Sequence, residues 1–279
     1  VLTTFHNLKM LEILKNTPNM LWTPQIPNYF AGYSKSQIKS LLMPLSPYSL
    51  DNKVKYDNIP PKSFDWSTLR PECMLVRDQA NCGGCWAFSS VDPFSDSRCI
   101  YHKDKKRVQY SEEYMIACDK NADGCYGGEL RQSWQFLAKT GVPSDKCVSF
   151  KSGVNGTTPK CPRKCDNGKK IKRTHVKFYF DVCDSEMSIM AALVFGPIQT
   201  GFTVYTDFLY YQKGIYQHTT GEIEGKHAVT IVGYGEENGI KFWKVRNSWS
   251  DKWAENGYFR IIRGINNCDF EQECYLGIP

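Results

Sequence analysis

Long apolar runs and concentrated charge are both missing from this chain of 279 residues. No stretch approaches the roughly 18 apolar residues that a membrane-spanning helix requires. The net charge of +6 is split evenly between the first 58 residues and the remainder, whereas nucleic-acid-binding proteins usually concentrate basic side chains. We therefore expect no membrane span and no nucleic-acid partner, and we interpret the basic run 169–173 as a solvated loop.

A secretory signal peptide is also missing, because residues 1–16 carry charges where such a peptide has its apolar stretch. Cysteine, in contrast, is abundant: twelve residues in an otherwise ordinary globular composition indicate an oxidising compartment. We expect a protein of the secretory pathway, secreted or held in acidic lysosome-like vesicles, whose signal peptide has been removed. Asn155 begins the one N-glycosylation sequon, which agrees with that location.

The first sixty residues have the pattern of a segment that lies over another part of the protein. Residues 34–42 predict a short helix, and the proline-rich residues 43–61 are typical of an extended linker. Another short helix is predicted over 1–16 from apolar residues at helical spacing, namely Phe5, Leu8, Leu11 and Leu14.

The remaining chain changes character near residue 174. Before it, helical signals occur over 85–101 and 128–141. After it, β-branched and aromatic runs separated by turn residues predict several strands. We therefore predict an α+β protein with a helical lobe and a β-rich lobe.

The segment QANCGGCWAF, residues 79–88, has a C-x-x-C spacing that fits three kinds of site: a redox pair, half of a zinc site, or one structural and one reactive thiol. A zinc site would need a second pair such as Cys161 and Cys165. A redox pair is expected within a βαβ unit, which the sequence does not show. A nucleophilic Cys85 needs a base.

His227 is the candidate base, because it alone of the five histidines lies in a strand-like apolar run. A lone histidine there is by default a hydrogen-bonded core residue, but Asn247 can orient its ring and Trp249 can shield that contact from water. Gln79 offers an amide donor beside the backbone N–H of Cys85, as a developing oxyanion requires. A helix N-terminus and a protonated imidazole both lower the pKa of a thiol.

With these residues in place, the sequence resembles the papain-like cysteine proteases, and most closely their cathepsin B-like members. CGGCW stands at 82–86, and His227 and Asn247 follow Cys85 by 142 and 162 residues. The matching segments run in the family's order over nearly all of 60–279: RDQ, CWAF, GCYGG, GKHAVTIVGYG and NSW.

The resemblance implies roles for four residues: Cys85 as nucleophile, His227 as base and acid, Asn247 as the residue that orients His227, and Gln79 as oxyanion donor. It implies no cofactor and no metal. Residues expected to line the substrate cleft are Gly127, Gly128, Lys226, Trp249 and Glu273.

Glu273 is expected at the bottom of the pocket for P2, the second residue before the scissile bond. A carboxylate there can pair with arginine, so we expect hydrophobic residues or Arg at P2. An exposed C-terminal carboxylate is the alternative.

The family's fold implies a helical L lobe over about 60–170 and a β-barrel R lobe over about 171–279, with the active site in the cleft between them. Residues 1–59 resemble the short cathepsin B-like propeptide, with Trp22 at its tryptophan. We therefore expect a zymogen whose N-terminal segment blocks the cleft; an N-terminal interaction tail is the alternative.

Four positions depart from the family pattern. Gly84 replaces Ser or Ala, Pro93 falls inside the expected helix and should bend it, Lys226 replaces the glycine before the histidine, and Ala254 replaces a glycine. None removes a catalytic group. A non-catalytic homologue and a thiol–disulfide oxidoreductase using Cys82 and Cys85 remain the alternatives.

Twelve cysteines with Cys85 free leave at least one more thiol unpaired, and the resemblance points to Cys268. A further bridge is expected between the neighbouring segments of Cys183 and Cys274. The disulfides implied by the resemblance are Cys73–Cys99, Cys82–Cys125, Cys118–Cys161 and Cys147–Cys165.

Cathepsin B-like enzymes remove C-terminal dipeptides by means of an occluding loop with two histidines. The matching span here, between Cys147 and Cys161, has thirteen residues and no histidine. We therefore expect an endopeptidase that acts on peptides and proteins as a monomer. Its own propeptide and cystatin-like inhibitors are the expected inhibitory partners.

Overall fold

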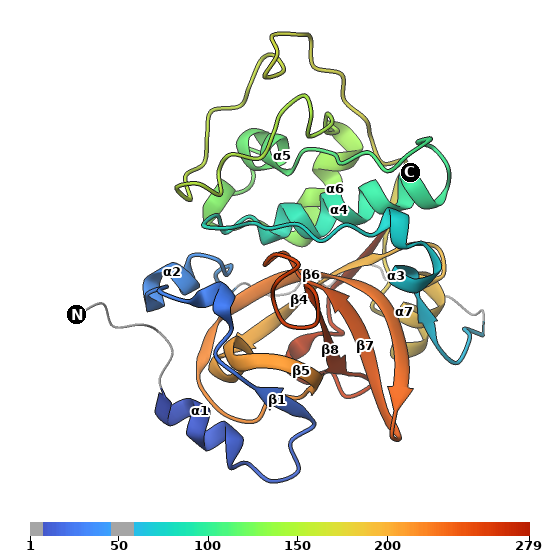
Figure 1. Cartoon of the computed structure of the whole chain (residues 1–279). Coiled ribbons are helices and arrows are strands. Elements are labelled where there is room, and N and C mark those ends of the chain that lie inside the picture. The colour runs from blue at the N-terminus through green and yellow to red at the C-terminus, as the bar shows by residue number, and fades with distance from the viewer. Residues whose placement is uncertain (1–7, 46–58) are drawn as a thin grey trace.

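The computed structural model describes residues 8–45 and 59–279, so Phe5 and most of the expected linker lie outside the described residues. A helical layer lies above a curved sheet (Figure 1). The helices are α1 Leu8–Lys15, α2 Lys35–Lys39, α3 Trp66–Leu69, α4 Cys85–Ile100, α5 Glu112–Cys118, α6 Leu130–Lys139 and α7 Glu186–Leu193. Short 3-10 turns are η1 Asn28–Phe30, η2 Pro71–Cys73, η3 Gly124–Tyr126, η4 Thr206–Tyr210 and η5 Asn267–Asp269.

The described strands form one sheet in the order β1-β5-β8-β7-β6-β4-β9-β3, and β2 pairs with β6 beside that path. Within it, only β5 and β8 run parallel. The bounds are β1 Trp22–Pro24, β2 Phe64–Asp65, β3 Phe178–Asp181, β4 Ile198–Tyr205, β5 Tyr211–Tyr216, β6 Ile223–Glu237, β7 Ile240–Arg246, β8 Tyr258–Ile262 and β9 Cys274–Ile278.

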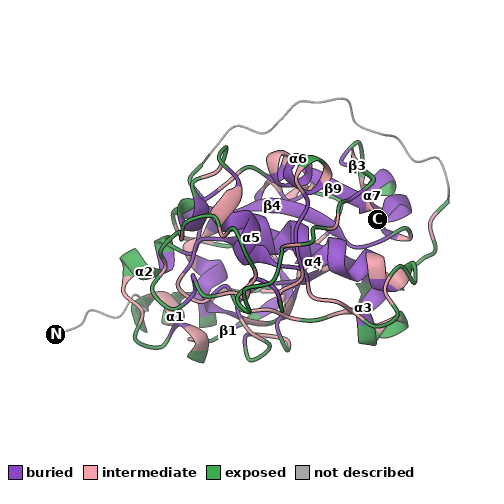
Figure 2. Ribbon diagram, turned by 90° about the horizontal axis from the view of Figure 1, so that it is seen from above, coloured by how far each residue is buried: buried purple, intermediate pink, exposed green. Residues whose placement is uncertain are grey.

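Helix α4 is the centre of the helical lobe. All of its residues except Arg98 and Ile100 are buried, and Figure 2 shows it enclosed by other elements. A helix covered on every side needs no amphipathic pattern, and its sequence has none. It continues through Pro93, which lies two turns beyond Cys85. None of the described helices is long and apolar enough to cross a membrane.

The two lobes have separate apolar cores, as an α+β papain-like fold requires. Segments from each end of the chain cross between the lobes. β2 pairs with β6 of the sheet, and Gly277 of β9 lies so close to Trp134 of α6 that a Cβ would overlap the indole. These crossings hold the lobes side by side with a cleft between them.

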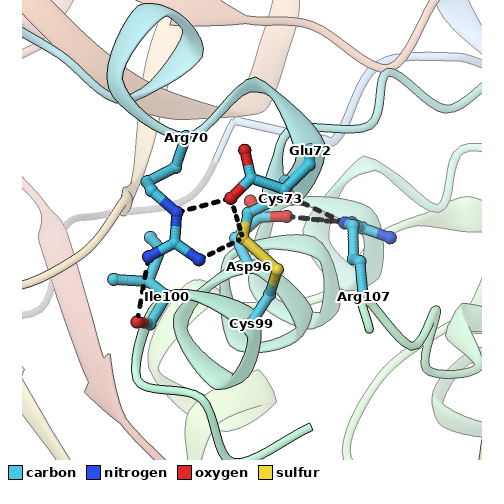
Figure 3. Close-up of a disulfide and its surroundings, with 7 residues drawn as sticks. All are labelled: Arg70, Glu72, Cys73, Asp96, Cys99, Ile100 and Arg107. Carbon is cyan, nitrogen blue, oxygen red and sulfur yellow. Dashed lines mark hydrogen bonds and ion pairs between the residues drawn. A yellow bond between two sulfur atoms is a disulfide. The ribbon is translucent and has the colours of Figure 1, made fainter. Parts of the chain in front are cut away.

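All five expected cysteine pairs are disulfides, with Cys82 bonded to Cys125. Within residues 59–279, where all twelve cysteines lie, Cys85 and Cys268 form no disulfide. These pairings leave no Cys82/Cys85 redox couple and no four-cysteine zinc site. Figure 3 shows Cys73–Cys99 at the end of α4, where Arg107 reaches both the Cys73 carbonyl (2.7 Å) and Asp96 (2.9 Å).

Candidate active site

Cys85 is the first residue of α4 and is fully buried. Small residues precede it for a steric reason, because a Cβ on Gly83 would lie 2.5 Å from the Ser40 carbonyl and one on Gly84 2.7 Å from Ile116. Burial raises the pKa of the Cys85 thiol to about 12, although hydrogen bonds from the backbone of Ala228 and Trp86 oppose that rise. The thiol is therefore protonated in this state.

His227 lies on β6 directly before Ala228, whose backbone hydrogen-bonds to the Cys85 thiol. Its Nε2 lies 2.7 Å from Asn247 Oδ1, which also accepts from the backbone N–H of Ser248 at 2.8 Å. Because Ser248 N–H requires an acceptor, the Asn247 oxygen faces the ring and His227 carries its proton on Nε2. The Nδ1 lone pair is then available as a base.

The ring of Trp249 stacks on His227, with ring centroids 4.6 Å apart and an interplanar angle of 22°. Both residues are fully buried. Burial lowers the pKa of His227 to about 4, and the hydrogen bond with Asn247 opposes this. The imidazole is therefore neutral at pH 7 in this state.

Gln79 is fully buried and held from both ends. Its Oε1 accepts from the Ser248 hydroxyl (2.6 Å), and its Nε2 donates to the Cys82 carbonyl (2.9 Å). The same Nε2 donates to the carbonyl of Leu41 at 3.0 Å. The Leu41 carbonyl oxygen thus accepts a hydrogen bond from the same Gln79 amide that we expect to stabilise an oxyanion.

The segment around Leu41 lies across the candidate site. Met43 exchanges two backbone hydrogen bonds with Lys226, at 2.7 and 2.9 Å. Gly127, at a φ of 129° that favours glycine, lies beneath this segment, because a Cβ there would sit 3.0 Å from Pro44. Gly128 packs on Trp86, where a Cβ would lie 2.6 Å from the ring. Both glycines therefore line the groove that this segment occupies.

Lys226 and Glu273 are both almost buried, with exposed fractions of 6% and 9%. Burial raises the pKa of Glu273 to about 7, and Lys226 and a hydrogen bond with Tyr275 oppose that rise. Burial also lowers the pKa of Lys226, against the effect of Glu273 and Asp269. The alternative in which Glu273 is an exposed carboxylate is therefore wrong.

Among the expected residues, the structure joins His227 to Asn247 and Trp249. Two further residues, which sequence reasoning missed, belong to the same network. Ser248 joins Gln79 to the Asn247 segment, and its place in the NSW segment was the signal that could have revealed it. Leu41 supplies the carbonyl bound by Gln79, and no sequence pattern marks it. Ala254 adopts a φ of 46°, which explains the glycine expected there.

Residues 60–278 match the papain family of cysteine proteases. Cathepsin B-like CP2 of Giardia intestinalis is 44% identical over 272 residues, which are 93% of this chain and 90% of that protein. Cathepsin B-like cysteine proteinase 4 of Caenorhabditis elegans is 34% identical, over 95% of this chain and 90% of its own. Among solved structures, proCathepsin B S9 from Trypanosoma congolense superposes with a TM-score of 0.90 at 27% identity, and 99% of each chain is covered.

A family match over most of the chain and relatives above 30% identity agree with the cysteine, histidine and asparagine assembled in the cleft. The chain belongs to the papain family of cysteine proteases, among its cathepsin B-like members.

Proposed function

We propose that the chain is the zymogen of a cathepsin B-like cysteine endopeptidase. The observation that carries this proposal is the contact of Gln79 with the Leu41 carbonyl, beside the buried Cys85 and the His227–Asn247 pair. A backbone carbonyl in that position resembles the substrate group that such a site attacks. The N-terminal segment therefore occupies the site without being cut.

The reaction begins when His227 Nδ1 takes the proton of Cys85 and the thiolate attacks the peptide carbonyl. The oxyanion accepts hydrogen bonds from Gln79 Nε2 and the backbone N–H of Cys85. His227 then gives its proton to the leaving amine, and an acyl-enzyme remains on sulfur. Water, deprotonated by His227, releases the acid and regenerates the thiol, while Asn247 keeps the ring oriented throughout.

Residues 1–59 act as an inhibitory propeptide, and their removal activates the enzyme. Support comes from the Leu41 and Met43 contacts in the cleft and from the fold match to a solved proenzyme over 99% of both chains. Residues 60–279 form the catalytic domain, with L and R lobes meeting near residue 170. The expected locations, secretion or acidic vesicles, suit an enzyme with five disulfides.

The short loop between Cys147 and Cys161 favours endopeptidase activity. It is fastened to the body of the L lobe, because Asn81 donates to the Gly153 carbonyl (3.0 Å) and Glu113 accepts from the backbone of Lys151 and Ser152 (3.1 Å each). We propose that a loop of this length, fastened in this way, does not block the far end of the cleft. Without a histidine, it also offers no imidazolium for a terminal carboxylate.

The P2 pocket around Glu273 is proposed to take hydrophobic residues or Arg. Peptides and proteins are the substrates, and cystatin-like inhibitors are expected to bind the opened cleft of the monomeric enzyme.

Internally quenched peptides that differ only in a free or amidated C-terminus two residues beyond the cut test the endopeptidase proposal. We expect kcat/KM values within about threefold of each other, because no charge-assisted contact awaits the carboxylate. A strong preference for the free carboxylate would contradict the proposal. Labelling with an epoxide inhibitor tests the identity of the nucleophile. We expect peptide mapping to find the label on Cys85 and to find none in Cys85→Ala.

A further inference from the structure

The cleft-facing side of the sheet is identified by strand alternation, since residues two apart share a face. On β6, Lys226 shares a face with Ala228, and their partners on β4 are Thr203 and Gly201. Gly201 lies against Leu130 of the helical lobe, where a Cβ would sit 3.2 Å from its side chain. This face of the sheet therefore looks into the cleft.

Strand β9 extends the same face. Tyr275 pairs with Gln199, two residues before Gly201 on β4, so Tyr275 and Glu273 belong to the face of Gly201. Tyr275 lies 3.4 Å from the Glu273 carboxylate. Lys226 on β6 and Glu273, which directly precedes β9, thus belong to one patch.

The charges of this patch are buried together. Lys226 interacts electrostatically with Glu273 and Asp269, and Asp269 accepts from the Thr203 hydroxyl at 2.9 Å. Glu129 and Asp181 also act on Glu273. An ammonium therefore already lies in the acidic environment that a P2 arginine would enter.

A side chain of the N-terminal segment marks what the pocket holds in this state. Met43 is 7% exposed and belongs to the same buried cluster as Leu130, Ala228 and Tyr275. Its backbone pairs with that of Lys226. The patch accordingly accepts an unbranched apolar side chain while Lys226 and Glu273 remain buried.

We propose that Lys226 determines specificity at P2: its ammonium accompanies Glu273 in the pocket and opposes an arginine there. The inference rests on the proposed function and refines it. The guanidinium of a P2 arginine is attracted by the Glu273 carboxylate but repelled by the Lys226 ammonium. In a partly desolvated site, such repulsion between like charges costs binding free energy. Hydrophobic P2 residues meet no such opposition.

The test uses enzyme converted from the full chain and two fluorogenic substrates with Arg at P1 and either Leu or Arg at P2. We expect Lys226→Met and Lys226→Gly to raise the Arg:Leu ratio of kcat/KM by on the order of tenfold or more. Adding Glu273→Gln to Lys226→Met should remove that gain. Lys139→Met, a change of the same type on the exposed side of α6, should leave the ratio unaltered.

An unchanged or lower ratio in both Lys226 variants would overturn the inference. A second measurement needs no catalysis and uses the intact chain with Cys85→Ala. Met43→Arg should lower the urea midpoint of unfolding less in the Lys226→Met background than with Lys226 present; an equal loss in both would overturn the inference. If no variant cleaved any peptide, the proposed function would fail, while this comparison would still decide the role of Lys226.

Discussion

At the scale of single residues, burial determines the protonation of Cys85 and His227, the proposed catalytic pair. Desolvation raises the pKa of Cys85 to about 12 and lowers that of His227 to about 4. The pair is therefore a thiol and a neutral imidazole across the intervening pH range, rather than the thiolate and imidazolium that attack substrates. Because the N-terminal segment covers the site, its removal should admit water and allow the ion pair to form.

Alkylation kinetics test this state. In the intact protein we expect iodoacetamide to modify Cys85 slowly at pH 7, with a rate that rises about tenfold per pH unit toward pH 11, since only the thiolate reacts. After conversion the rate at pH 7 should rise by at least about a hundredfold. The measurement is peptide mapping by mass spectrometry over a pH series.

Cys268 provides an internal reference, because burial and Asp207 raise its pKa to about 12 as well. Its slow labelling should not change on conversion. Rapid, pH-independent labelling of Cys85 in the intact chain between pH 5 and 8 would contradict the neutral-pair assignment.

At the scale of elements, the N-terminal segment is held by local structures that place its cleft-bound part. Ser34 and Gln37 form a reciprocal capping box at the start of α2, with bonds of 3.3 and 2.8 Å. Helix α2 ends at Lys39, just before the carbonyl of Leu41 reaches Gln79. Strand β1 adds to the sheet edge at β5, so the segment is bound at two places.

Trp22 is the main anchor of β1. It is 4% exposed, donates its indole N–H to the Gln217 carbonyl (3.0 Å) and lies 5.4 Å from the Tyr216 ring. Truncating a buried tryptophan costs about 3–5 kcal/mol. We expect a peptide of residues 8–45 with Trp22→Ala to inhibit the converted enzyme at least about a hundredfold less well than the unaltered peptide.

Leu8→Ala in the same peptide serves as the matched control, because Leu8 is 75% exposed. Its inhibition constant should change by less than about twofold. Equal inhibition by the Trp22 variant and the unaltered peptide would mean that β1 does not anchor the segment.

At the scale of the whole molecule, a buried ion pair connects the lobes beside the active site. Arg246, which precedes Asn247, lies 2.6 Å from Asp96 of α4, and both side chains are almost inaccessible. Asp96 also forms an ion pair with Arg107 at 2.9 Å. The Arg246–Asp96 pair therefore links the helix that begins at Cys85 to the strand that ends at Arg246, directly before Asn247.

Removing one partner should leave a buried charge uncompensated. We expect Arg246→Met to destabilise the Cys85→Ala chain by about 3–5 kcal/mol, measured by urea unfolding. Combining it with Asp96→Leu, which also deprives Arg107 of this partner, should give a total loss smaller than the sum of the two single losses. Strictly additive effects would show that the two groups do not depend on each other.

Acid should convert the whole chain to the active form. Asp78 accepts from the Tyr29 hydroxyl (2.8 Å), and Lys39 pairs with Glu224 (3.8 Å), so two carboxylates of the catalytic part hold the N-terminal segment. Burial and Asp78 raise the pKa of Tyr29 well above its usual range, which keeps the hydroxyl a donor. Contacts that depend on a carboxylate generally weaken in acid, because the charge is lost.

We therefore expect incubation at about pH 4–5 to release residues 1 to about 59 and raise peptidase activity. Asp78→Asn, which resembles the protonated acid, should convert at higher pH than the unaltered chain. N-terminal sequencing and activity measure both outcomes. Full activity of the uncut chain at acid pH would contradict the proposed inhibitory role.

Much of the fold and the catalytic set could be read from the sequence alone. The strand around His227 and the later strands depend on local runs of apolar residues, which the sequence shows directly. The roles expected for Cys85, His227, Asn247 and Gln79 came from their spacing and from the family resemblance. Four of the five disulfides followed from the family resemblance, and Cys183–Cys274 followed from the expected neighbouring segments. Pro93 did not end its helix, because α4 is supported on all sides by tertiary packing.

Only the tertiary structure decided how distant groups share one environment. The Leu41 carbonyl reaches Gln79, and Lys226 meets Glu273, because the chain brings four separate segments into the cleft. Burial there determines which groups carry charge, and burial is a property of the whole packed molecule rather than of neighbouring residues. The sequence therefore determined which reactive groups the protein carries. The fold decided that, in this state, the Cys85 thiol is neutral and is covered by the protein's own propeptide-like segment.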